Sequence, residues 1–189
     1  MKQEHVAIPL HRPKPSEMIF FFSCGVIMSV PITLFIIQLL EPLTTGLDPF
    51  YAGLVSTAFF SPFIEEFSKV FPLFYRHGET QRSIFNLAVM VGLGFAIVEL
   101  ITYVVALGVP WYFRLPGLFF HPAATSISAY GIATKRPVQF YAVAVALHFT
   151  NNFLAAVNPF PVSVSIFVVA LTVFVAWKLN ERIQEKIIV

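Results

Sequence analysis

Long apolar stretches, separated by short polar connections, run through almost the whole chain. They occupy residues 18–40, 50–75, 84–107, 115–133, 138–157 and 160–179. Each is close to the roughly 20 residues that a helix needs to cross the hydrocarbon core of a bilayer. The pattern predicts an all-α fold: a polytopic integral membrane bundle of about six transmembrane helices.

The composition agrees with a membrane protein and excludes several other classes. Hydrophobic residues make up 57% of the chain and charged residues 12%, and the mean hydropathy is +0.78. A net charge of +2 carried by the connections does not indicate nucleic-acid binding. Cys24 is the single cysteine, so no intrachain disulfide can form. We expect one membrane-embedded domain over residues 1–189.

The basic residues predict how the helices are oriented. Lys and Arg are concentrated before the first stretch, after the sixth, and in alternate connections, whereas the opposite connections contain only Arg114. Positive residues favour the cytoplasmic side. Both termini are therefore predicted to be cytoplasmic, with tails at residues 1–17 and 180–189.

The second stretch carries three charged residues near its middle, where charge is most costly in lipid. Lys69 follows Glu65 by four residues and Glu66 by three, so on a helix the ammonium group can reach either carboxylate. Lys69 can neutralise only one of the two glutamates. The second carboxylate is left over and could act as a general base. A purely structural ion cluster is the alternative interpretation.

Three other stretches place polar residues at a similar depth. At about 1.5 Å per residue, Glu99 and His121 fall roughly 4 to 5 Å from the middle of their helices, and His148 falls near the middle. Pro122 predicts a break in the helix at His121 that would admit water, and a simple kink is the alternative. His148 and Asn152 share one helix face, where an imidazole and an amide could together bind a developing oxyanion. Interhelical hydrogen bonding is the alternative role for this pair.

Taken in order, these residues resemble a known family. Glu65-Glu66-x-x-Lys69, Phe95-x-x-x-Glu99, His121 and His148-x-x-x-Asn152 are similar to the motifs of the PrsW intramembrane proteases, which are related to the CAAX prenyl proteases of the CPBP superfamily. The resemblance implies an endopeptidase that cleaves membrane-anchored proteins, with anti-sigma factors among the substrates of bacterial members. It also implies a multi-pass protein of a prokaryotic cell membrane.

The resemblance also implies roles for the residues. Glu65 would activate water, Glu66 and Lys69 would support it, and His148 with Asn152 would stabilise the tetrahedral intermediate. Glu99 and His121 would complete the site. We favour glutamate-activated water without an obligatory metal, and zinc is the alternative cofactor. Its candidate ligands are Glu65, Glu99, His121 and His148.

Two other functions remain open at the level of sequence. A proton- or ion-coupled transporter would also gather Glu, His and Asn near the midplane, although no internal repeat is visible. A scaffold that binds other membrane proteins without cleaving them could have the same fold.

Overall fold

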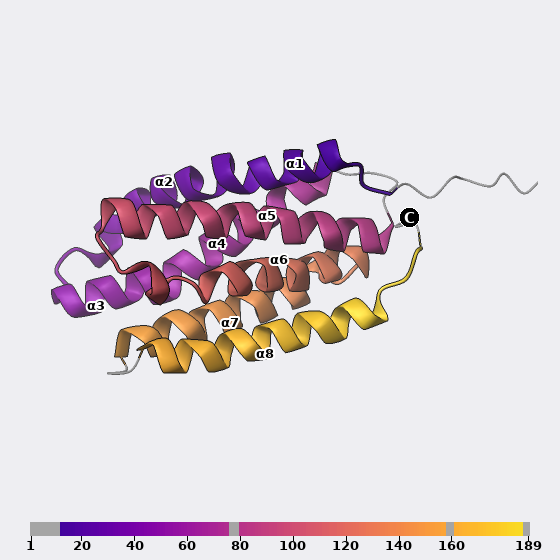
Figure 1. Ribbon diagram of the computed structural model, residues 1–189. Helices are drawn as coiled ribbons and strands as arrows, with labels where there is room; N and C mark the ends of the chain where they lie inside the picture. Colours follow the sequence, from indigo (N-terminus) through magenta and orange to yellow (C-terminus); the bar gives the residue numbers. More distant parts are fainter. Residues whose placement is uncertain (1–11, 76–79, 158–160, 187–189) are drawn as a thin grey trace, which may run out of the picture.

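The computed structural model describes residues 12–75, 80–157 and 161–186, and these residues form helices without a β-strand (Figure 1). Consecutive helical segments join into six rods that run along one axis. The elements are α1 (Pro15–Cys24), η1 (Gly25–Ser29), α2 (Val30–Leu40), η2 (Glu41–Thr44), α3 (Pro49–Leu54), η3 (Val55–Phe60), α4 (Ser61–Val70), η4 (Phe71–Tyr75), α5 (Gln81–Ile101), η5 (Thr102–Ala106), η6 (Trp111–Phe113), α6 (Gly117–Ala133), α7 (Pro137–Val157) and α8 (Pro161–Arg182).

The predicted all-α bundle is confirmed. Three rods, Pro15–Thr44, Gln81–Ala106 and Pro137–Val157, are long and apolar enough to cross a membrane. Parts of the two predicted tails, residues 1–11 and 187–189, lie outside the described residues, as do the connections at 76–79 and 158–160.

Local sequence signals set where the rods begin. α1 has Pro15 at its first position, where the missing N–H costs no helical hydrogen bond. The Asp48 side chain accepts from Phe50 N at 2.9 Å and caps α3. The Thr80 hydroxyl accepts from Ser83 N at 3.1 Å and caps α5 in the same way.

Two prolines of the second rod, Pro62 and Pro72, coincide with changes of helical register. The π-helical turn η3 directly precedes α4, whose second residue is Pro62, and the 3-10 turn η4 contains Pro72. Because proline lacks an N–H, the carbonyl one turn earlier loses its helical donor. The sequence predicts bent helix around both prolines, and the altered register occurs there.

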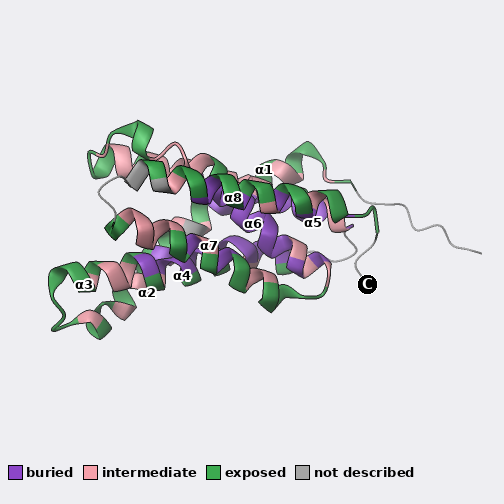
Figure 2. Cartoon of the chain, turned by 90° about the horizontal axis from the view of Figure 1, so that it is seen from below, coloured by how far each residue is buried: buried purple, intermediate pink, exposed green. Residues whose placement is uncertain are grey.

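α6 is the central helix of the bundle and packs against α4, α5, α7 and α8. Most of it is buried, as Figure 2 shows. Its second half is rich in Ala, Ser and Gly, and small residues let neighbouring helices approach closely in a membrane. One apolar core lies between α6, α7 and α8, and another between α1, α4 and α5.

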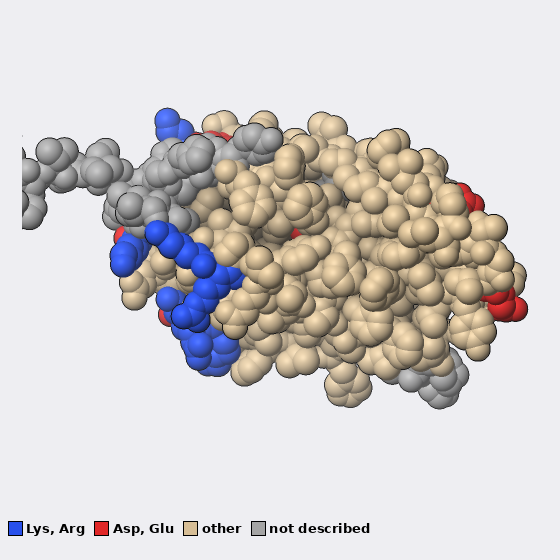
Figure 3. Space-filling model, turned by 180° about the vertical axis from the view of Figure 1, so that it is seen from behind, with Lys and Arg blue, Asp and Glu red and all other residues tan. Residues whose placement is uncertain are grey.

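The outer surface suits lipid along most of its length. Large apolar side chains such as Phe20, Leu34, Val105 and Phe167 are exposed on it. Figure 3 shows Lys and Arg gathered at one end of the bundle, with a broad uncharged surface beyond them. Such a belt is what the hydrocarbon region of a bilayer requires.

Candidate active site

The charged residues of α4 are buried in the middle of the bundle. Glu66 and Lys69 are fully buried, and Glu65 is 7% exposed. Buried charge persists only when it is paired and hydrogen-bonded. The pairing involves three further helices, α5, α6 and α7, which contribute Glu99, His121 and His148.

Lys69 connects α4 to α6. Its Nζ lies 2.6 Å from Glu66 Oε1 and 3.1 Å from His121 Nδ1. The same ammonium group lies 4.7 Å from the ring centroid of Phe95 on α5, within the range of a cation–π interaction. Because an ammonium group only donates, His121 Nδ1 must accept. This assigns the proton of a neutral His121 to Nε2.

Glu99 accepts a hydrogen bond from this N–H of His121 and also forms an ion pair with Arg114. Its Oε2 lies 2.8 Å from His121 Nε2, and its Oε1 lies 2.6 Å from Arg114 Nη2. The guanidinium carbon of Arg114 lies 3.8 Å from the ring centroid of Tyr103. Arg114 precedes α6, so the segment between α5 and α6 folds back to fix Glu99. The carboxylate is therefore oriented from two sides.

The backbone at His121 is held by close packing against α5. A Cβ built on Gly92 would lie 2.6 Å from the His121 carbonyl oxygen and 2.6 Å from Pro122 Cα, so only glycine fits there. The predicted break at His121 is wrong, because α6 is continuous through Pro122. Proline removes one donor, that for the Leu118 carbonyl near the start of the helix, and the remaining turns continue.

His148 lies between the two glutamates. Its Nδ1 is 2.7 Å from Glu66 Oε1, and its Nε2 is 3.7 Å from Glu65 Oε2. Since Glu66 Oε1 is a carboxylate oxygen, Nδ1 carries a proton and donates to it. The other nitrogen faces Glu65 across a distance too long for a direct hydrogen bond.

The two glutamates differ in the number of donors around them. Glu66 Oε1 accepts from both Lys69 and His148, so this oxygen is saturated. Glu65 Oε1 accepts a short hydrogen bond from Ser61, one turn earlier on α4. Glu65 Oε2 and Glu66 Oε2 are buried without a hydrogen-bond partner. Of these two free oxygens, Glu65 Oε2 is the one that faces His148 Nε2, at a distance of 3.7 Å.

Asn152 binds the backbone of the bent helix that leads to the glutamates. The N–H of Ser61 donates to Ser56 O in π-helical register, and Pro62, the next residue, has no N–H. The Thr57 carbonyl therefore lacks a donor from its own helix in either register. Asn152 Nδ2 supplies one at 3.0 Å. This hydrogen bond ties α7 to η3, the turn that precedes α4.

A small polar pocket of about 40 Å³ lies beside this network. Its volume suits water, which needs several polar neighbours. Asn151 accepts from Ser165 Oγ on α8 at 2.7 Å and donates to Asn152 Oδ1 at 3.3 Å. The lining residues are Glu99, Phe113, Arg114, Gly117, Phe120, His121, His148, Asn151, Asn152, Ser165 and Val169.

The structure joins most of the residues singled out in the sequence. Contacts of at most 3.7 Å link Glu65, Glu66, Lys69, Glu99, His121 and His148 into one network. Asn152 lines the pocket beside His148, with one N–H committed to Thr57.

Sequence reasoning missed two residues of the network. Ser61 precedes Glu65 by four residues, so helical spacing could have identified it. In the sequence, Arg114 was notable only as the single basic residue in the connections predicted to lie outside the cell. No local pattern connects it to Glu99.

The donor atoms also permit a test of whether zinc fits. One donor atom from each of Glu65, His121 and His148 lies within 4.8 Å of the others. Carboxylate oxygen and imidazole nitrogen are ordinary zinc ligands. Glu65 Oε2 is free and faces His148 Nε2, so these two fit directly. His121 fits only if one of its nitrogens is released, because Nδ1 is bonded to Lys69 and Nε2 to Glu99. Glu99, the fourth predicted ligand, has its oxygens bonded to Arg114 and His121.

Comparison with known proteins identifies the family. Residues 14–177 match the family model for PrsW proteases, described as a PrsW family intramembrane metalloprotease. No curated protein and no solved structure matches the chain. The matched range includes every residue of the buried network and nearly the whole helical bundle. The chain thus belongs to the PrsW family of intramembrane proteases, whose substrates are membrane proteins.

Proposed function

We propose that this protein hydrolyses peptide bonds of membrane-anchored proteins with a water molecule activated by Glu65. The observation that carries the proposal is the free, buried Oε2 of Glu65, which faces His148 Nε2 at 3.7 Å. A general base needs an oxygen that is not already occupied by donors. Glu66 Oε2 is also free of donors, but the Glu66 carboxylate is held through Oε1 by both Lys69 and His148, which favours Glu65 as the base.

In the proposed reaction, Glu65 Oε2 takes a proton from water while the water oxygen attacks the scissile carbonyl carbon. The carbonyl oxygen becomes an oxyanion. His148 donates from Nδ1 to Glu66, and a proton on its Nε2 would let it donate to this oxyanion as well. When the C–N bond breaks, the proton held by Glu65 passes to the leaving amine, and a carboxyl and an amino terminus result.

Asn152 contributes a second donor in this proposal. Its Nδ2 carries two hydrogens, and one of them binds Thr57 O. The other is available to the oxyanion. Because the Thr57 bond holds the amide in place, little reorganisation is needed when charge develops.

The remaining network fixes the two central side chains. Lys69 neutralises Glu66, and Glu66 orients the His148 ring. His121, Glu99 and Arg114 in turn hold Lys69 from the opposite side. These residues act as positioning residues, because a misplacement of about 1 Å can cost 100-fold in rate.

Zinc is the alternative that the family description raises. Glu65 and His148 would hold the ion, and His121 would be a third ligand if Lys69 or Glu99 released one of its nitrogens. A bound zinc would polarise the water and the scissile carbonyl. We favour the route without an obligatory metal because both nitrogens of His121 are already bonded, Nδ1 to Lys69 and Nε2 to Glu99.

The test is cleavage of a library of single-span proteins by the protein purified in detergent. Wild type is compared with His148→Ala and with wild type treated with a chelator. Cleavage that survives chelation and is lost in His148→Ala supports the proposal. Loss on chelation with recovery on adding zinc would show that a metal is required, and equal cleavage by His148→Ala would show that the assigned site is wrong.

A further inference from the structure

A long apolar groove runs along the outside of the bundle between α8 and the start of α6. Its volume is about 660 Å³, and ten residues line it: Tyr112, Leu115, Pro116, Phe119, Ile166, Val169, Ala170, Val173, Phe174 and Trp177. The α8 residues recur at intervals of three and four, so they form one face of that helix. From Ile166 to Trp177 this face extends about 16 Å at 1.5 Å per residue.

The groove meets the polar pocket of the candidate active site. Val169 lines both. The neighbours Arg114 and Leu115 likewise divide between the pocket and the groove, as do Ser165 and Ile166. The same two helices and the same segment before α6 thus border both spaces, and the groove is adjacent to the pocket that His148 and Glu99 line.

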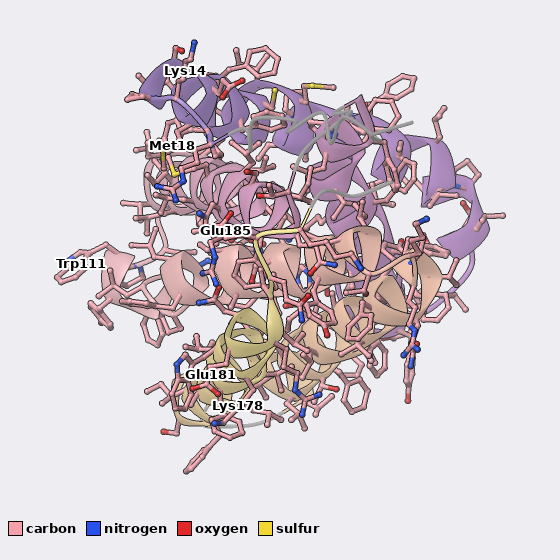
Figure 4. All side chains as sticks on the ribbon, turned by 90° about the vertical axis from the view of Figure 1, so that its right-hand side faces the viewer. Lys14, Met18, Trp111, Lys178, Glu181 and Glu185 are labelled. Atoms are coloured by element: carbon pink, nitrogen blue, oxygen red, sulfur yellow. The ribbon has the colours of Figure 1, made fainter. Side chains whose placement is uncertain are left out.

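The other grooves lack this continuity. A groove of about 220 Å³ between α4, α6 and α7 and another of about 230 Å³ between α2 and η3 share no lining residue with the polar pocket. Seen along the bundle, Trp111 projects outward, away from the side chains gathered in the centre (Figure 4). Tyr112, the next residue, borders the groove.

We propose that the groove between α6 and α8 binds the transmembrane helix of the protein substrate and directs its unwound end to the polar pocket that His148 lines. This inference rests on the proposed proteolysis. A lipid chain would fill the apolar part but would leave the polar pocket unused, whereas a peptide carries backbone N–H and C=O groups that can bind there. Ala170, in the middle of the groove's α8 face, is small, and small residues allow two helices to approach closely in lipid.

The test is site-specific photo-crosslinking in proteoliposomes. The probe is a synthetic single-span peptide of about 25 residues, with a Leu and Ala repeat, Lys at both ends and a Gly-Pro pair that breaks the helix near one end. The photoreactive residue is placed at Ala170 or Val173 in the groove, in a Glu65→Gln background. Leu171, 52% exposed on the same helix, and Phe167, 77% exposed, are matched positions outside the groove.

The proposal predicts peptide crosslinks from Ala170 and Val173 that exceed those from Leu171 and Phe167 by about tenfold. Equal crosslinking at all four positions would show ordinary exposure to the membrane and overturn the proposal. So would crosslinks confined to photoreactive residues at Phe74 or Val138, in the groove between α4 and α7, or groove crosslinks to lipid but not to peptide.

A second measurement separates this inference from the proposed function. In an otherwise wild-type protein, Ala170→Trp fills the groove and is expected to slow cleavage of single-span proteins about tenfold, while Leu171→Trp leaves it unchanged. Groove crosslinks without any cleavage by wild type would leave the docking surface standing and refute proteolysis. Cleavage that Ala170→Trp does not slow would refute the docking surface and leave proteolysis standing.

Discussion

Lys69 is the residue on which the buried network depends most. Its ammonium group is fully buried and holds both Glu66 and His121. A charge left alone in a low-dielectric interior costs far more than the pair itself. The structure therefore assigns Lys69 a role in stability as well as in the orientation of the site.

Replacing Lys69 by methionine should destabilise the protein by about 3–5 kcal/mol, because Glu66 would be left buried without its counter-charge. The measurement is unfolding in detergent, monitored by the loss of the helical circular dichroism signal. Lys178→Met is the matched control, since Lys178 forms an exposed pair with Glu181 and its loss should cost less than about 1 kcal/mol. Equal stability of the two variants would mean that Lys69 is not held as a buried charge.

Arg114 makes a different prediction, because it acts through Glu99. Arg114→Gln should lower the cleavage rate by about 10-fold to 100-fold and leave substrate affinity unchanged, since only positioning is lost. Arg114→Lys keeps the charge and should recover part of the rate. Arg82→Gln removes a half-exposed ion pair with Glu185 and should have no effect on the rate. A change in affinity alone would contradict a positioning role.

At the scale of elements, the contact between α5 and α6 decides where His121 lies. Gly92 is the point of closest approach, since a Cβ there would lie 2.6 Å from the His121 carbonyl oxygen. Backbone cannot yield as a flexible side chain can, so a methyl group must separate the helices. The position of His121, and through it that of Lys69, follows from this one glycine.

Gly92→Ala should destabilise the protein by about 1–3 kcal/mol and slow cleavage, because overpacking shifts α6. Gly53→Ala is the control, as a Cβ at Gly53 meets no atom within 4 Å. Thermal unfolding in detergent and cleavage of one reporter provide the two readouts. Equal thermal stability and equal cleavage by Gly92→Ala and Gly53→Ala would contradict the close contact between α5 and α6 at Gly92.

The elements themselves could be predicted well from the sequence. Apolar length alone identifies the six rods, because lipid requires helices of a set length. The polar network between Glu65, Glu99, His121 and His148 also agrees with their predicted common depth. The register change at η3 could not be predicted in detail, since it depends on which donor reaches the Thr57 carbonyl.

Contacts between segments distant in sequence escaped prediction for a physical reason. Arg114 lies in a connection, and its hydrogen bond to Glu99 depends on how that connection folds back over α5. Asn152 was predicted as an oxyanion donor from its spacing to His148. Its bond to Thr57 O arises from Pro62, on another helix. Helical spacing reports neighbours on one helix and says little about partners across the bundle.

For the whole molecule, the arrangement of charge predicts its orientation in the membrane. Lys and Arg gather at the end of the bundle where α8 ends (Figures 1 and 3). A reporter fused after Val189 should therefore be cytoplasmic. A reporter inserted after Thr45, in the connection at the opposite end, should be outside. The reverse result for both reporters would invert the predicted topology, and with it the side from which substrates approach.

The central claim is that Glu65 activates the water that cleaves a membrane-anchored substrate. The most direct measurement is the single-turnover rate of cleavage of a single-span protein in proteoliposomes, for wild type and Glu65→Gln at equal amounts of folded enzyme. The account predicts a loss of about 100-fold to 10,000-fold in Glu65→Gln, the usual contribution of a general base. A rate in Glu65→Gln equal to that of wild type would contradict it.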